Sequence, residues 1–149
     1  MIPVSISVQE NDFDVSREID SLTAEVGTVG AVASFSGLVR DEDKSLSSMT
    51  LEHYAGMTEK AIGEIVGTAL ERWSLLGVRV IHRIGKLLPG DRIVLVVVSS
   101  KHRGDAFAAC EFIMDYLKTQ APFWKREETV EGARWVEARD SDDEAAGRW

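Results

Sequence analysis

Residues 112–127 read Phe-Ile-Met-Asp-Tyr-Leu-Lys-Thr-Gln-Ala-Pro-Phe-Trp-Lys-Arg-Glu, and they predict how a helix and a strand meet in this fold. The segment begins with apolar residues at helical spacing. Pro122 then ends the helix, because proline lacks a backbone N–H and disfavours helical geometry in the residue before it. The chain continues in extended form, so Lys118 at the helix exit and Lys125 beyond the break are expected to lie near each other.

Aromatic rings are interleaved with these two amines, at Tyr116, Phe123 and Trp124. A solvated run of charge needs no such rings, whereas a pocket for a flat anionic molecule does. A lysine beside another cation in partly apolar surroundings has its ammonium form disfavoured. Such a lysine can act as an acid or base, or as a nucleophile. The alternative for a lone lysine is structural, as a partner of the helix dipole and the last helical carbonyls.

Outward from this segment, the hydrophobic pattern predicts the remaining elements. Three- and four-residue spacing predicts helices over residues 14–25, 58–73 and 104–119. Alternating or continuous apolar runs predict strands over residues 2–8, 30–40, 49–54, 78–85, 92–99, 123–129 and 133–137. This order mixes hairpins with helical crossovers, which favours an α+β domain over a doubly wound sheet.

Several local features sharpen this prediction. The continuous apolar run 92–99 is typical of a strand buried on both faces. Gly37, inside a predicted strand, indicates a bulge or a close backbone approach. Residues 88–91, Leu-Pro-Gly-Asp, predict a turn. Residues 41–48 are expected to form a mobile loop, and the acidic tail 140–149 is expected to fray.

Length and composition limit the possible classes of protein. At 149 residues the chain is expected to form a single domain over 1–149. A net charge of -8 argues against nucleic-acid binding, and no apolar run reaches the roughly 20 residues that cross a bilayer. There is no secretory signal pattern, and one cysteine excludes an internal disulfide or a CxxC zinc motif. We therefore expect a cytoplasmic protein without a metal site.

Charge is unevenly distributed along the chain. Residues 1–28 hold one basic residue against six acidic ones, whereas residues 101–126 hold five basic residues against three acidic ones. A locally basic region can attract an anion while the acidic remainder keeps the protein soluble. The alternative is the ordinary fluctuation of charge along any sequence.

Other candidate residues carry weaker signals. The pair His102–Arg103 opens the third predicted helix, where free N–H groups and the helix dipole favour an anion. Arg40 closes a predicted strand, where a plain surface charge is the common alternative. His53 and His82 lie in predicted strands without a second histidine at ligand spacing, so structural roles are expected. Cys110 lies on an apolar helix face and is expected to behave as a small hydrophobic residue.

Several ordered blocks of the sequence resemble one known family. They are Leu51-Glu-His-Tyr-Ala-Gly-Met-Thr-Glu-Lys60, Val80-Ile-His-Arg-Ile-Gly85, Pro89-Gly-Asp91, Ser100-Lys-His-Arg103, Phe112-Ile-Met-Asp-Tyr-Leu-Lys118 and Ala121-Pro-Phe-Trp-Lys-Arg-Glu127. Together they resemble the large, catalytic subunit of molybdopterin synthase. The resemblance runs from about Gly30 to Trp149, and residues 1–28 match only loosely.

The resemblance implies a fold, a reaction and partners. The implied fold is an α/β-hammerhead domain with an additional antiparallel β subdomain. The implied reaction transfers two sulfur atoms to cyclic pyranopterin monophosphate and gives the dithiolene of molybdopterin, without a bound cofactor. The sulfur donor is a small, ubiquitin-like partner subunit with a thiocarboxylated C-terminal Gly-Gly. The large subunit is expected to form a homodimer that binds two such partners, giving a heterotetramer.

The resemblance also implies roles for individual positions. Lys118 falls on the essential catalytic lysine and Lys125 on a second functional lysine. The substrate-contacting positions are Leu38, Val39, Arg40, His102, Arg103, Lys118, Lys125, Arg126 and Glu127. Many family members have lysine where this chain has Leu38, so a side-chain ion pair is unavailable there and contact must be apolar or through the backbone.

Two other function classes remain open from the residues themselves. A non-enzymatic module that binds an anionic ligand or the C-terminal tail of a partner would bind both reactants and make no sulfurated product. An enzyme that forms a Schiff base on Lys118 would be trapped by borohydride in the presence of a carbonyl substrate.

Overall fold

The computed structural model describes residues 2–25, 27–42, 44–136 and 140–149, with the backbone alone at 140 and 141. Its strands are β1 (Val4–Gln9), β2 (Ala31–Leu38), β3 (Leu46–His53), β4 (Gly77–Arg83), β5 (Gly85–Leu87), β6 (Arg92–Ser100), β7 (Phe123–Thr129) and β8 (Gly132–Val136). Its helices are α1 (Val15–Leu22), α2 (Met57–Arg72), α3 (Arg103–Gln120) and α4 (Asp140–Ala146). The helices and strands expected from the sequence are present, which confirms an α+β fold.

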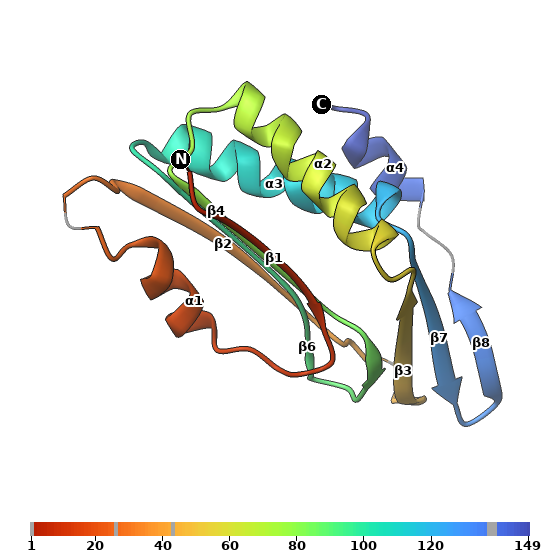
Figure 1. The fold of residues 1–149 in the computed structure, drawn as a ribbon. Coiled ribbons are helices and arrows are strands. Elements are labelled where there is room, and N and C mark those ends of the chain that lie inside the picture. Colours follow the sequence, from red (N-terminus) through yellow and green to blue (C-terminus); the bar gives the residue numbers. More distant parts are fainter. Residues whose placement is uncertain (1, 26, 43, 137–139) are drawn as a thin grey trace.

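The strands form two separate sheets (Figure 1). The first has the order β1-β4-β6-β2, with β1 parallel to β4 and the other pairs antiparallel. The second has the order β5-β3-β7-β8 and is antiparallel throughout. This second sheet is the additional antiparallel β subdomain that the resemblance implies.

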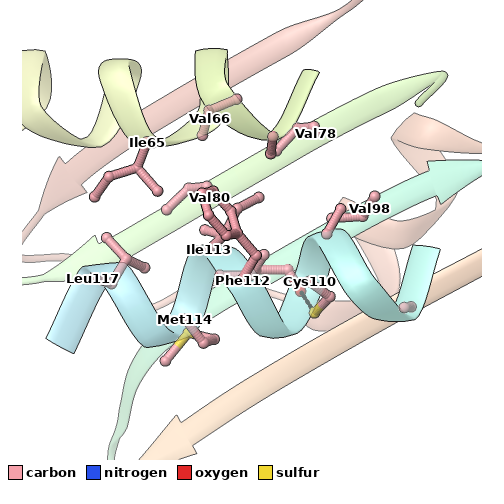
Figure 2. Packing of buried hydrophobic residues seen from close by; sticks show 14 of the residues in the cluster. Ile65, Val66, Val78, Val80, Val98, Cys110, Phe112, Ile113, Met114 and Leu117 are labelled. Carbon is pink, nitrogen blue, oxygen red and sulfur yellow. Dashed lines mark hydrogen bonds between the residues drawn. The ribbon is translucent and has the colours of Figure 1, made fainter. Parts of the chain in front are cut away.

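The core lies between the first sheet and the helices on its two faces. Strand β6 alternates between these faces: Val94, Val96 and Val98 pack with α2 and α3, while Leu95 and Val97 pack with α1. All five residues are nearly or fully buried, which confirms the prediction of a strand buried on both faces. Figure 2 shows the side chains of α2 and α3 meeting over β4 and β6.

Helix α3 begins and ends where the sequence predicts, within one residue. The four core residues predicted for it are all buried, namely Ala106, Cys110, Ile113 and Leu117. The helix ends at Gln120, and Ala121 is already extended, with φ -81° and ψ 128°. This is the geometry that a following proline imposes. The helix therefore delivers the chain directly into β7 of the second sheet.

Gly37 marks an irregularity near the end of β2. The pairing register with β6 shifts between Gly37 and Leu38, so the predicted bulge is confirmed. A Cβ at this position would lie 2.8 Å from Cγ1 of Val94, closer than real side chains come. The bulge turns the end of β2 toward the second sheet, and Val39 and Arg40 follow it there.

Two sequence predictions were wrong in detail. The loop expected over residues 41–48 ends earlier, because β3 begins at Leu46 and pairs with β7. The single strand expected over residues 78–85 is two strands, because Gly85 has a positive φ of 83° and turns the chain into β5. The expected end of the last strand at residue 137 lies outside the described residues.

The tail expected to fray instead contains helix α4, which lies near α3 (Figure 1). The Trp149 ring packs at its edge against Trp73 and Phe112, with centroid distances of 5.5 and 5.8 Å. The guanidinium of Arg148 forms ion pairs with Glu111 and Asp115 at 2.8 and 3.1 Å. These contacts after the helix, rather than an apolar face of α4 itself, order the tail.

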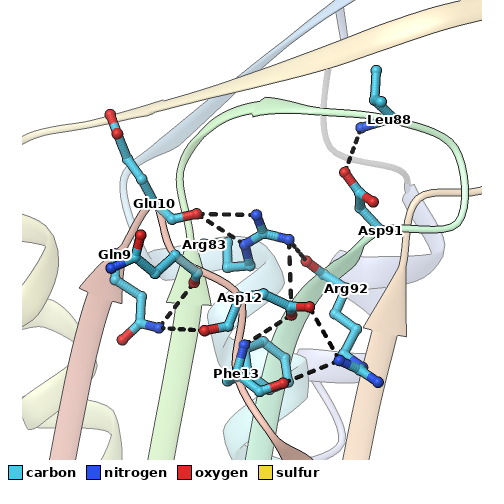
Figure 3. A network of polar contacts seen from close by, with 9 residues as sticks. Gln9, Glu10, Asp12, Phe13, Arg83, Leu88, Asp91 and Arg92 are labelled. Atoms are coloured by element: carbon cyan, nitrogen blue, oxygen red, sulfur yellow. Dashed lines mark hydrogen bonds and ion pairs between the residues drawn. The ribbon is translucent and has the colours of Figure 1, made fainter.

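The partly buried guanidinium of Arg83 joins the ends of β1 and β4 to the beginning of β6 (Figure 3). Arg83 donates two hydrogen bonds to the Glu10 carbonyl, at 3.0 and 3.1 Å, and one to the Arg92 carbonyl at 3.0 Å. Asp12 pairs with Arg92 at 3.1 Å, and the Phe13 N–H is the main cause of a lowered pKa at Asp12. The network fixes the backbone around Arg83, immediately after His82.

Candidate active site

A cavity of about 530 Å³ lies where the end of α3, the end of β2 and the second sheet meet. This volume is within the range of small-molecule sites. Its apolar lining comes from Phe35, Leu38, Val39, Leu46, Met49, Ile93, Val94, Met114, Leu117, Ala121, Phe123 and Val136. Its polar lining comes from Ser36, Arg40, His82, Lys118, Lys125, Glu127 and Asp142, together with Gly37.

Lys118 reaches the cavity from the last turn of α3. Met114 and Leu117 lie on the same wall of the helix and are buried, whereas Lys118 itself is exposed. The helix ends two residues later because Pro122 cannot continue it. The lysine is therefore placed on a rigid helix with its amine at the edge of an apolar wall.

Lys125 reaches the same cavity from β7. Side chains alternate across a strand, so Phe123, Lys125 and Glu127 share the face that lines the cavity. Lys125 is half-buried and lies opposite Leu51 of β3 and Val136 of β8. The break at Pro122 thus brings the two lysines to one cavity, as the sequence predicts.

Arg40, Glu127 and Asp142 complete the charged lining. Arg40 lies beyond the bulge at the end of β2, and its exposed guanidinium pairs with Glu42 at 3.2 Å. Both Nε and Nη2 of Arg134 donate to Oε2 of Glu127, at 3.2 and 2.9 Å. Arg40, Lys118 and Lys125 thus face two carboxylates in the lining, Glu127 and Asp142, and Arg134 also binds Glu127. The small excess of positive charge favours an anionic ligand.

Three of the sequence-predicted site residues lie away from this cavity. Arg126 alternates to the opposite face of β7, where it pairs with Glu128 at 2.6 Å. His102 and Arg103 lie at the beginning of α3. Arg103 precedes Lys118 by 15 residues, which corresponds to about 22 Å along a helix axis. Within one chain, His102 and Arg103 therefore cannot contact a small molecule that is bound beside Lys118.

His82 lines the cavity, although the sequence predicts only a structural role for it. Its side chain is buried, and its ring stacks on Phe123 with centroids 3.7 Å apart and an interplanar angle of 18°. Burial lowers the pKa of His82 to about 4, against a backbone hydrogen bond to Arg83 that raises it, and the charges of Lys118 and Lys125 lower it further. The ring is therefore neutral near pH 7. A polar residue in a buried strand is the only sequence signal that marked it.

Cys110 lies outside the cavity lining, on the buried face of α3. Burial raises the pKa of its thiol to about 11. A thiol in this state is a poor nucleophile at neutral pH, because the thiolate is the reactive form. The prediction that Cys110 behaves as a small hydrophobic residue is confirmed.

The described residues offer neither a cluster of metal ligands nor a membrane-spanning helix. They contain no group of three or more histidine, cysteine, aspartate or glutamate side chains arranged to hold a metal ion. No helix among them is long and apolar enough to span a bilayer.

The fold and the cavity define an α+β protein with a cavity lined by Arg40, Lys118 and Lys125 at the junction of a mixed sheet and an antiparallel sheet. The model of a known family, described as MoaE protein, matches residues 8–120. The chain belongs to this family.

Individual relatives agree with this assignment. The molybdopterin synthase catalytic subunit of Ralstonia nicotianae is 60% identical over 147 residues, covering 97% of this chain and 84% of the relative. A solved structure of the molybdopterin biosynthesis MoaE protein from Burkholderia ambifaria has a TM-score of 0.84 and 51% identity, covering 100% of this chain and 98% of that one. A complex of subunits 1 and 2 of molybdopterin-converting factor from Helicobacter pylori shares the fold, with a TM-score of 0.75, 20% identity and coverage of 90% and 91%.

Proposed function

We propose that the cavity beside Lys118 is where sulfur is transferred from the thiocarboxylate of a small partner protein to cyclic pyranopterin monophosphate. The coarser function follows from the family: the chain acts in molybdopterin synthesis as a catalytic subunit, an enzyme that transfers sulfur. The observation that carries the finer proposal is the lining of one cavity by Lys118, Lys125 and Arg40, which come from α3, β7 and the end of β2.

The cavity matches the chemistry of the proposed substrate. Cyclic pyranopterin monophosphate combines a flat ring system with a phosphate. Apolar side chains such as Phe35, Met114 and Leu117 supply a surface for the rings. Arg40 and the lysines supply donors for the phosphate, since arginine and lysine form strong charge-assisted hydrogen bonds to phosphate oxygens.

The same cations suit the proposed sulfur donor. A thiocarboxylate at the end of a Gly-Gly tail is an anion on a narrow, extended segment, and the exposed Leu38 at the cavity offers it an apolar contact. The Helicobacter pylori complex supports a two-subunit assembly, because it joins subunits 1 and 2 of molybdopterin-converting factor and shares the fold of this chain. With a net charge of -8 on the chain, docking of the partner is expected to depend on apolar area and local basic residues.

The proposed mechanism uses the partner's sulfur as the nucleophile. The thiocarboxylate sulfur attacks a side-chain carbon of the pterin, a C–S bond forms, and an oxygen of the substrate leaves after protonation. Lys118 supplies that proton or steadies the anionic intermediate. Water then cleaves the acyl–sulfur bond, so the sulfur stays on the pterin and the partner leaves as a carboxylate. A second round with a fresh partner supplies the second sulfur.

The state of Cys110 supports an external sulfur source. Its thiol is buried and has a raised pKa, so it is poorly suited to carry sulfur between molecules. A single free cysteine also agrees with the proposed setting, a reducing cytoplasm.

We also propose that the chain forms a homodimer, the centre of a heterotetramer with two partner proteins. His102 and Arg103 lie about 22 Å from Lys118 along α3, so they reach a substrate only in the cavity of a second copy. A symmetric dimer would bring the beginning of α3 in one copy to the cavity of the other, and the reverse.

Reconstitution tests the reaction. The purified chain is mixed with thiocarboxylated small subunit and cyclic pyranopterin monophosphate, and the product is identified by mass spectrometry. Lys118→Ala is expected to lower the rate by about 100-fold or more, the usual contribution of a positioned acid or base. Lys60→Ala, on the exposed face of α2, is the matched control and should leave the rate unchanged.

The result also separates the other function classes. Binding of both reactants without any sulfurated product would identify a non-enzymatic binding module. A Lys118→Ala variant with near-normal product formation would remove Lys118 from the mechanism. Mass gain on Lys118 after borohydride treatment would indicate a Schiff-base enzyme instead.

Mixed dimers test the second-copy proposal. Lys118→Ala and Arg103→Ala chains, each inactive alone, are co-expressed so that they combine at random. About a quarter of wild-type activity should return, because half of the dimers are mixed and each has one intact cavity. Activity that stays at the level of the separate variants would show that both residues act within one chain.

A further inference from the structure

His82 is a polar side chain at the cavity that the proposed mechanism leaves without a task. It comes from β4 of the first sheet and stacks on Phe123, the first residue of β7 in the second sheet. Stacking alone would be served equally well by phenylalanine or tyrosine. The choice of an imidazole at a buried position therefore calls for a role for its nitrogen atoms.

One of these nitrogen atoms is already engaged. Nδ1 lies 2.9 Å from the backbone carbonyl of Arg83. A carbonyl oxygen only accepts, so Nδ1 carries the hydrogen in the neutral ring. The Arg83 backbone is itself held by the guanidinium network across β1, β4 and β6 (Figure 3). The ring is thus fixed in one tautomer, in which Nε2 is the nitrogen that can accept a hydrogen bond.

The surroundings keep this acceptor uncharged. His82 is buried, and the charged groups that act on it, Lys118, Lys125 and His53, all disfavour a further positive charge. The cations that line the cavity donate hydrogen bonds and accept none. The two lining carboxylates, Glu127 and Asp142, are charged acceptors, and Arg134 binds Glu127. Nε2 of His82 therefore offers the cavity a neutral acceptor that would repel phosphate or carboxylate oxygens and attract an N–H group.

We propose that His82 is a specificity-determining residue, whose Nε2 accepts a hydrogen bond from an N–H of the heterocycle that enters the cavity. The proposal rests on the proposed function and deepens it. A reduced pterin carries ring N–H groups and an exocyclic amine, whereas the phosphate and the partner's thiocarboxylate have only acceptors. His82 would then orient the ring system, while Lys118, Lys125 and Arg40 bind the anionic groups.

Three substitutions separate the acceptor from the other properties of the ring. His82→Phe keeps the stack on Phe123 and removes both nitrogen atoms. His82→Asn keeps a donor near the Arg83 carbonyl and removes the acceptor. His82→Gln places an amide oxygen near the position of Nε2. The matched control is His53→Asn, since His53 lies on β3 outside the cavity lining.

Binding is measured separately for the two reactants, by titrating each variant with cyclic pyranopterin monophosphate and with the unmodified small subunit. We expect His82→Phe and His82→Asn to weaken pterin binding by about tenfold, the usual loss for one hydrogen bond to a neutral group. His82→Gln should stay within about threefold of the wild type, and binding of the small subunit should be unchanged in all three. Thermal unfolding of each variant shows whether the fold is intact.

The alternatives give different results. Wild-type pterin affinity in His82→Phe would show that stacking is the whole role of the residue. Equal losses for the pterin and the small subunit, or an equal loss in His82→Gln, would show a general collapse of the cavity. Any one of these three results overturns the proposal. Failure of the wild-type chain to form sulfurated product would instead contradict the proposed function, and the binding measurements would still decide whether Nε2 is used.

Discussion

Replacement of Trp149 by alanine tests whether the C-terminal segment is part of the folded core. The ring packs at its edge against Trp73 and Phe112, and its Nε1 donates to Oδ2 of Asp115 at 2.5 Å. Tryptophan to alanine costs about 3–5 kcal/mol in a full core, and Trp149 is only partly buried. Asp115 also keeps its ion pair with Arg148. We therefore expect the free energy of unfolding to fall by about 2–3 kcal/mol.

Urea unfolding followed by tryptophan fluorescence and by circular dichroism measures this loss. With a denaturant slope of about 2 kcal/mol per M, the midpoint should shift by roughly 1 M. Trp135→Ala is the matched control, because Trp135 is 58% exposed on β8, and it should change stability by no more than about 0.5 kcal/mol. If Trp149→Ala behaves like Trp135→Ala, the segment after residue 140 is frayed, and the packing described for it is wrong.

Three further perturbations have defined outcomes. Gly30→Ala should destabilise the fold by about 1–3 kcal/mol, because a Cβ there would collide with the Lys101 carbonyl oxygen. A Cβ at Gly67 meets nothing within 4 Å, so Gly67→Ala should stabilise α2 by about 0.5–1 kcal/mol. Thermal unfolding of the two variants compares these effects. The Cys110 thiol, with its pKa raised to about 11, should react with iodoacetamide at pH 8 at least about 100-fold more slowly in the folded chain than in denaturant, and comparable rates would contradict its burial. The pKa of His82 is lowered from 6.5 to about 4, so the unfolded chain binds a proton at a higher pH than the folded chain does, and the free energy of unfolding should drop by up to about 3 kcal/mol as the pH falls from 6.5 to 4. Urea titrations across this pH range should show a smaller drop for His82→Phe than for the wild type. Equal drops in the two proteins would refute the lowered pKa.

The sequence predicted most of the fold because its long elements have strong patterns. The bounds of helix α3 and strand β6 were predicted to within one residue. The helical spacing in α3 extends over several turns, and the apolar run in β6 extends over several residues. Helix α4 was missed for a physical reason. Its residues are acidic and small, so no apolar face announces it, and its order comes from Trp149, beyond its last residue.

The candidate site was predictable in part. The break at Pro122 indicated that Lys118 and Lys125 lie together, but nothing in their spacing brings Arg40 to them, because that depends on the bulge after Gly37 and on sheet pairing. The period of two along β7 was an available signal that Arg126 faces away from Lys125. His82 had no comparable signal, since a strand pattern does not reveal that a cavity opens at one of its positions.

The length of α3 fixes the distance between the predicted site residues at its two ends. The helix carries Arg103 in its first turn and Lys118 in its last, and its 18 residues extend for about 27 Å. Insertion or deletion of one residue in its middle would displace one end by about 1.5 Å and rotate it by about 100° relative to the other. Substitutions along this helix leave the spacing between Arg103 and Lys118 unchanged, but a change in the number of residues does not. Any assembly that uses both ends of α3 depends on this spacing.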